Sequence, residues 1–182
     1  MEDAGRGLTT RGIVISAVLA AIAVFLAATR FGFIPTPTGI NDTILHIPAI
    51  IGGILEGPLV GAIIGTIFGL YSFFYATIPL FKDPIVAILP RIFIGIFAAY
   101  TYRAVRPAGE VAAIAVAAVV GTATNTVLVL GFGVLRHYLP AKVAVTIAST
   151  QGVVEAVVAA IVCLAVLLPW KRVQRGQARA RL

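Results

Sequence analysis

The chain alternates between long apolar runs and short breaks that are polar or rich in proline and glycine. A helix needs roughly 20 apolar residues to cross a bilayer, and most of the runs approach or exceed that length. The pattern predicts an all-α integral membrane protein with a single domain, residues 1–182, and six transmembrane helices. Their approximate ranges are 12–30, 40–56, 59–80, 85–103, 110–136 and 143–169.

The break between the second and third runs decides the number of helices. Here the sequence Glu56-Gly57-Pro58 interrupts a stretch in which glycine recurs every four residues, at Gly53, Gly57, Gly61, Gly65 and Gly69. Residues four apart share one face of a helix, so these glycines predict a groove that another helix backbone can approach closely. A turn at Pro58 gives six helices, whereas a kink gives five.

Charged residues favour the turn. With six helices, both termini lie on one side of the membrane together with most of the basic residues, namely Arg6, Arg11, Arg103, Arg106, Lys171, Arg172, Arg175, Arg179 and Arg181. The other side keeps Arg30, Lys82, Arg136 and Lys142. Because cytoplasmic loops carry an excess of Lys and Arg, this arrangement predicts that both termini are cytoplasmic. The second run is short, so its helix either starts near Gly39 or is a short span.

The composition agrees with a membrane protein. Hydrophobic residues make up 60% of the chain and charged residues 12%, and the mean hydropathy is +1.04. Soluble globular proteins contain about 25% charged residues. The net charge of +7 comes mainly from basic residues at the ends of apolar runs, where they set topology and contact lipid headgroups, so we expect no nucleic-acid partner.

Polar side chains inside predicted helices are the candidate binding residues, because such groups are costly in a membrane. They are Arg91, Asn125, Gln151 and Glu155. All four fall in the outer half of their helices or near the midplane, which predicts one polar pocket open to the outside. A guanidinium can hold a carboxylate or phosphate with two parallel hydrogen bonds. The alternative is an internal Arg91–Glu155 ion pair that holds the helices together.

Three further residues are candidates for contact with a ligand. His46 lies near the predicted outer surface, where helix packing is the alternative role. Asn41 precedes the second helix, and we expect it and Asp42 to cap that helix through their side-chain oxygens. Tyr75 belongs to an aromatic cluster that either forms an interfacial belt or walls the pocket.

Motifs for chemistry are absent from the sequence. It contains no G-x-x-x-x-G-K-[ST] motif, so the chain alone cannot hydrolyse ATP, and no G-x-S-x-G or H-E-x-x-H motif. We therefore expect no catalytic residues, no metal and no cofactor. A membrane enzyme is therefore disfavoured. A self-sufficient membrane facilitator or channel that uses the same polar pocket remains an alternative.

Two segments resemble a known family. The block HIPAIIGGILEGPLVGAIIGTIFGLYSF, followed by ILPRIFIGIFAAYTYR, resembles the S components of energy-coupling factor (ECF) vitamin transporters. The resemblance implies a protein of the bacterial or archaeal plasma membrane that binds a vitamin on the extracellular side. It also implies that the protein delivers the vitamin inward together with a membrane coupling subunit and two ATPase subunits.

The same resemblance suggests roles for individual residues. The His-Ile-Pro and Leu-Pro-Arg segments look most like the pantothenate-type branch, and pantothenate carries a carboxylate for Arg91 and hydroxyls for Asn125 or Gln151. In the family, small residues on the first helix meet the coupling subunit. This role falls here on Ala17 and Ala21, for which ordinary helix packing is the alternative.

Overall fold

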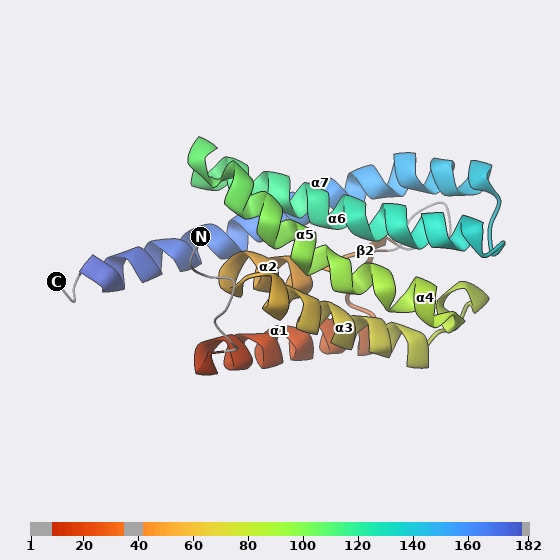
Figure 1. The fold of residues 1–182 in the computed structure, drawn as a ribbon, viewed down its shortest axis with the longest axis horizontal. Helices are drawn as coiled ribbons and strands as arrows, with labels where there is room; N and C mark the ends of the chain where they lie inside the picture. The colour runs from red at the N-terminus through yellow and green to blue at the C-terminus, as the bar shows by residue number, and fades with distance from the viewer. Residues whose placement is uncertain (1–8, 35–41, 180–182) are drawn as a thin grey trace.

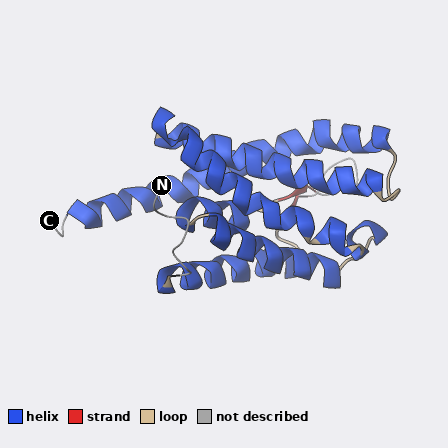
Figure 2. Ribbon diagram, viewed as in Figure 1, coloured by secondary structure: helices blue, strands red, loops and turns tan. Residues whose placement is uncertain are grey.

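The structure is a computed structural model that describes residues 9–34 and 42–179. The described residues form a predominantly helical protein with six helices of ten or more residues and only a two-residue pair of strands (Figure 2). The long helices are α1 (Thr10–Ala28), α2 (Ile47–Glu56), α3 (Pro58–Phe74), α5 (Leu89–Val105), α6 (Glu110–Leu135) and α7 (Ala141–Arg179). The short elements are β1 (Phe33–Ile34), β2 (Asp42–Thr43), η1 (Pro79–Lys82), α4 (Pro84–Ala87) and η2 (Arg106–Ala108).

The helices run back and forth as a bundle, and the end of α7 extends beyond it (Figure 1). The apolar core lies between α2, α3, α5, α6 and α7, and α1 packs against α2 and α3. Within the described residues, four segments are long and apolar enough to cross a membrane: Thr10–Ala28, Pro84–Ala108, Glu110–Leu135 and Ala141–Gln174. Helices α2 and α3 are shorter and also apolar. The protein is therefore membrane-embedded.

The break at Pro58 is a turn and not a kink. Helix α2 ends at Glu56, α3 begins at Pro58, and Gly57 between them has a φ of 99°. Glycine adopts this left-handed conformation without the steric cost of a side chain, and proline suits the first position of the next helix. Figure 1 shows that α2 and α3 run in opposite directions, as a helical hairpin requires.

The second helix begins later than residue 40. Asp42 and Thr43 instead pair with Ile34 and Phe33 in the antiparallel strands β2 and β1, which delays the start of α2 to Ile47. The prediction that Asp42 caps this helix is wrong, because His46 occupies the N-cap position and forms no side-chain cap hydrogen bond. Asn41 lies outside the described residues.

Three other helices differ from the predicted ranges by more than two residues. Helix α3 ends at Phe74, before residue 80, and η1 follows. The predicted helix 85–103 is divided into α4 and α5 just before Pro90, which has no N–H group to continue the hydrogen-bonding pattern. Helix α7 continues through Pro169 to Arg179, beyond the predicted end at 169, because the residues after Pro169 are mostly good helix formers.

The predicted glycine groove is confirmed, and α5 fills it. A Cβ atom on Gly61 would lie 2.7 Å from the Cα atom of Gly95, and one on Gly53 would lie 2.3 Å from the Gly95 carbonyl oxygen. Farther along α3, a Cβ atom on Gly65 would lie 2.0 Å from the carbonyl oxygen of Arg91. The α2–α3 hairpin thus packs backbone to backbone against α5 and sets the position of Arg91.

Candidate functional site

Arg91 is buried at the start of α5, with 4% of its surface exposed. Its Nη1 donates a hydrogen bond to the Val86 carbonyl oxygen at 2.5 Å. This oxygen lies in the single turn of α4, where carbonyl groups lack partners within the helix. The guanidinium carbon lies 4.8 Å from the ring centre of Phe81 and 5.7 Å from that of Phe68, so both rings stabilise the cation. Its Nε has no hydrogen-bond partner among the described residues.

His46 and α6 form a second buried polar group. The His46 side chain is fully buried, and its Nε2 shares a 2.9 Å hydrogen bond with the Thr122 hydroxyl. Asn125 follows Thr122 by three residues and therefore lies on the same face of α6. His46 Nδ1 and Asn125 Oδ1 are buried, and neither has a hydrogen-bond partner in the described part of the chain. An unpaired buried polar atom costs stability, so these atoms are suited to meet a polar ligand.

Glu155 on α7 connects the strand pair to the bundle. Its Oε1 accepts a hydrogen bond from the Thr43 backbone N–H at 2.7 Å and lies 3.4 Å from the Thr43 hydroxyl. Gln151 is one turn earlier on α7 and only 8% exposed. Beside it, a Cβ atom on Gly152 would lie 3.2 Å from the Thr126 Cγ2 atom, so Gln151 and Asn125 lie at the same level of the α6–α7 pair.

The charges of these groups act on one another. Arg91 and Glu155 attract each other electrostatically, and the positive charge of Arg91 also acts at His46. These two described side chains do not form the direct salt bridge considered above, because Arg91 donates to Val86 while Glu155 accepts from Thr43. The side chains of His46 at the start of α2, Arg91 on α5 and Glu155 on α7 therefore form hydrogen bonds with different partners. The charge of Arg91 nevertheless acts on both of the other two.

An ion pair at the same end of the bundle joins two connections between helices. The buried Asp83 accepts a 2.7 Å hydrogen bond from Arg136 Nε and a 3.0 Å bond from the Ile85 N–H, so it links the start of α4 to the end of α6. Tyr138 adds a hydroxyl at 3.4 Å. The hydrogen bond from Arg136 is the main reason that the pKa of Asp83 is lowered.

The remaining predicted residues lie elsewhere. Tyr75 is 70% exposed at the end of α3 and stacks on Tyr71 at 4.6 Å, as an interfacial aromatic pair would. Ala17 and Ala21 are exposed on α1, whose other face buries Gly12, Ser16, Ala20, Ala23 and Ala27. Asn41, outside the described residues, has no assigned position. Among the residues with described positions, no group of three or more His, Cys, Asp or Glu could hold a metal ion.

Sequence reasoning missed four residues of this region: Thr43, Phe68, Phe81 and Thr122. The run Thr122-Ala-Thr-Asn125-Thr126 in a predicted membrane helix was a usable signal, because its polar residues at positions 122, 125 and 126 share one face. The other three depend on contacts between distant segments.

Comparison with known proteins identifies the class. Residues 11–167 match the family described as the ECF transporter, substrate-specific component, and the chain belongs to this family. It is therefore a substrate-binding component of a membrane transporter.

The chain is also similar to an individual transporter. The chain is 32% identical over 181 residues to the pantothenic acid transporter PanT of Lactococcus lactis subsp. cremoris (strain MG1363), and the match covers 85% of this chain and 91% of the relative.

Proposed function

We propose that this protein is the substrate-specificity subunit of an ECF-type ABC transporter and that its substrate is pantothenate. The observation that carries the proposal is the buried guanidinium of Arg91, which keeps Nε without a partner among the described residues. A carboxylate ligand matches this group in charge and geometry. The similarity to a pantothenic acid transporter supports the choice among vitamins.

Each polar group has a proposed role. Arg91 binds the pantothenate carboxylate, and Asn125 and Gln151 bind its hydroxyl or amide groups. Glu155 holds Thr43, and thereby the strand pair, next to the ligand, while His46 contributes through Nδ1. Tyr75 and Asn41 remain proposed contacts from the connections that follow α3 and precede α2.

The distribution of charge supports six spans with both termini in the cytoplasm. Arg11, Arg103, Arg106 and Lys171 belong to one end of the bundle, where Arg11 pairs with Glu56 and Lys171 with Glu110. Arg136 pairs with Asp83 at the other end. The positive-inside rule therefore supports the end richer in basic residues as the cytoplasmic one. On this orientation, the proposed position of Arg91, six residues after the exposed Ile85, is towards the outer side.

The proposed partners are a membrane coupling subunit and two ATPase subunits. The exposed position of Ala17 and Ala21 supports α1 as the docking helix, because small residues allow another helix to approach closely. The proposed cycle is extracellular capture of the vitamin followed by ATP-driven release inside the bacterial cell.

The test has two parts. Native mass spectrometry of the purified protein identifies the small molecule that it retains, and we expect pantothenate; a different vitamin contradicts the substrate. Uptake of labelled pantothenate is then measured in vesicles with and without the coupling subunit and ATPases. We expect uptake only with these partners and ATP, whereas uptake by the chain alone would identify a facilitator.

A further inference from the structure

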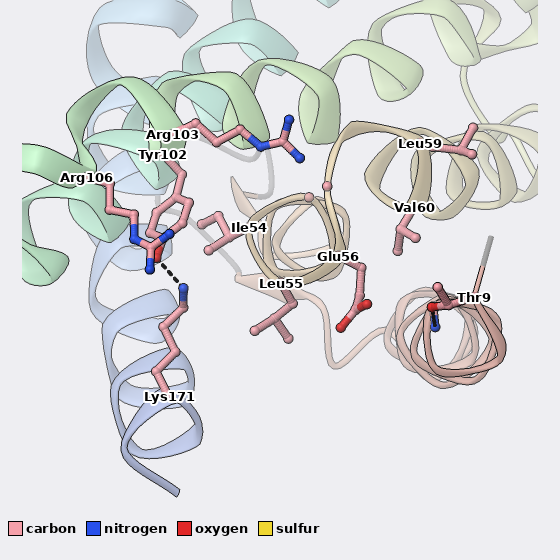
Figure 3. A pocket seen from close by; sticks show the side chains of 13 residues that line it. Thr9, Ile54, Leu55, Glu56, Leu59, Val60, Tyr102, Arg103, Arg106 and Lys171 are labelled. Carbon is pink, nitrogen blue, oxygen red and sulfur yellow. Dashed lines mark hydrogen bonds between the residues drawn. The ribbon is translucent and has the colours of Figure 1, made fainter. Parts of the chain in front are cut away.

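A cleft of about 450 Å³ lies at the end of the bundle opposite the Asp83–Arg136 pair. It opens between the start of α1, the α2–α3 turn, the end of α5 and the distal part of α7 (Figure 3). Its volume is within the range of small-molecule sites, roughly 300–1,000 Å³. Of the residues proposed above for vitamin binding, those that the structure describes do not line it.

Basic side chains dominate the polar part of the cleft. They are Arg103 at the end of α5, Arg106 in η2 and Lys171 on α7, and Glu56 is the only acidic side chain among the described residues that line the cleft. Figure 3 shows the Lys171 side chain directed at the Tyr102 hydroxyl, while Arg103 extends towards the α2–α3 turn. The wall formed by α5 and α7 is therefore positively charged.

Two of these cations are not neutralised by a neighbour. Lys171 pairs with Glu110 at 3.0 Å and also contacts the Tyr102 hydroxyl, and Glu56 pairs with Arg11 at 2.9 Å. Arg103 and Arg106 are exposed and have no ion-pair partner among the described residues. The cleft thus presents two guanidinium groups to an anion.

Apart from Thr9 and Tyr102, the other side chains of the lining are apolar, and the α2–α3 hairpin contributes them as Ile54, Leu55, Leu59 and Val60. Trp170 is exposed next to Lys171, and exposed tryptophan in a membrane protein marks the headgroup level of the bilayer. A ligand that combines a phosphate with an apolar part matches both halves of the lining better than a small inorganic ion does. Basic pockets between membrane helices commonly bind the headgroups of anionic lipids.

We propose that this cleft binds the phosphate of an anionic phospholipid headgroup, held by Arg103 and Arg106 with its glycerol and acyl parts against Leu55 and Leu59. Arginine suits this role because its planar fork binds phosphate oxygens through two parallel hydrogen bonds. The site is independent of the identity of the vitamin.

The test measures lipid retention. The full-length protein is purified in mixed micelles of phosphatidylglycerol and phosphatidylcholine, and native mass spectrometry counts the phosphatidylglycerol molecules that stay bound. The test variant is Arg103→Gln/Arg106→Gln. The matched control is Arg30→Gln/Lys142→Gln, which removes two exposed charges at the opposite end.

We expect the wild type and the control to retain the same amount of phosphatidylglycerol. The test variant should retain at least about tenfold less. The conservative variant Arg103→Lys/Arg106→Lys should recover part of the retention. Pantothenate binding is measured on every variant, so a folding defect is distinguished from a lipid effect. If the Gln variant does not fold, the Lys variant and the single Gln variants carry the test.

Other results overturn the proposal. Equal retention of phosphatidylglycerol by the test variant and the control would overturn it. A test variant that loses assembly with the coupling subunit while its lipid retention is unchanged would also overturn it, because the cleft would then bind a protein. A separate arm adds inorganic phosphate to lipid-free detergent samples. Thermal stabilisation there that depends on Arg103 and Arg106, without lipid retention, would assign the site to a free anion and overturn the lipid.

Discussion

Gly65 lies directly against the backbone of Arg91, so close that a Cβ atom on Gly65 would approach the Arg91 carbonyl oxygen to 2.0 Å. The glycine groove on α2 and α3 therefore has two roles. It lets the hairpin pack closely against α5, and it sets the depth and rotation of α5 at Arg91, which we propose binds the ligand's carboxylate.

Replacing Gly65 should disturb both stability and binding. In Gly65→Ala, the added methyl group meets the backbone of α5, which cannot move aside as a side chain would, so we expect a loss of about 1–3 kcal/mol of stability and weaker pantothenate binding. Gly131→Ala is the control, because a Cβ atom on Gly131 would have no neighbour within 4 Å. Thermal unfolding in detergent compares the stability of the two variants, and titration calorimetry compares their affinity for pantothenate. Equal stability and equal affinity of the two variants would contradict this role of Gly65.

The Thr43–Glu155 hydrogen bond predicts different effects for two substitutions at one position. Glu155→Gln keeps an oxygen that accepts from the Thr43 N–H, whereas Glu155→Ala removes it. We expect Glu155→Ala to weaken vitamin binding and to speed amide hydrogen exchange in residues 42–46, and Glu155→Gln to do so less. Exchange rates that do not change in Glu155→Ala would show that this carboxylate does not hold the strand pair.

The Asp83–Arg136 pair predicts a dependence of stability on pH. Its hydrogen bond lowers the pKa of Asp83 below the unfolded value of about 3.9. The pair therefore stabilises the fold above that pH, and the contribution is lost as the pH falls through the lower folded-state pKa.

Thermal unfolding at several pH values checks this sign. We expect Arg136→Gln to have a lower Tm than the wild type between pH 5 and 7, and the difference to shrink as the pH falls below about 4. Asp83→Asn, which can still accept from the Ile85 N–H, should show the same convergence with the wild type. A difference that is constant over the whole pH range would exclude the ionised pair as its cause.

The exposed alanines of α1 predict a separation of binding from transport. Ala17→Trp and Ala21→Trp add bulk at two exposed positions of the described bundle, so we expect pantothenate affinity to remain within about twofold while assembly with the coupling subunit fails. Ile22→Trp is the control. Ile22 is also exposed, but successive residues of a helix point about 100° apart, so it lies on another face.

Co-purification with the coupling subunit and uptake in vesicles measure the effect. Normal assembly of both alanine variants would remove α1 as the docking helix, and failure of all three variants would show that bulk anywhere on α1 is not tolerated.

Much of the fold follows from local features of the sequence. The apolar runs indicate the membrane helices, and Gly57-Pro58 together with the sorting of Arg and Lys residues indicates the hairpin. The small β1–β2 pair and the late start of α2 were not predictable in this way. Strands of two residues carry no periodic pattern, and the Thr43 N–H donates to Glu155, which is distant in the sequence.

The candidate site was predictable only in part. Arg91, Asn125, Gln151 and Glu155 stand out because polar groups in a membrane helix are costly. The partners that hold them do not stand out: Val86 contributes a backbone carbonyl oxygen, Phe81 a ring, and Thr43 a backbone N–H. Such contacts depend on how α4 and the strand pair lie against the bundle, which no short segment of sequence encodes.

The most direct test of the proposed site compares pantothenate with panthenol, in which a hydroxymethyl group replaces the carboxylate. Isothermal titration of the wild type and of Arg91→Gln with both ligands isolates the carboxylate–guanidinium contact, with Lys142→Gln as a control for charge at the same end. A hydrogen bond to a charged group contributes about 1.5–3 kcal/mol, which is roughly 10- to 150-fold in Kd.

We predict that the wild type and the control prefer pantothenate by at least about tenfold, and that Arg91→Gln binds both ligands equally weakly. A preference that survives unchanged in folded Arg91→Gln would contradict the assignment of Arg91 as the carboxylate ligand.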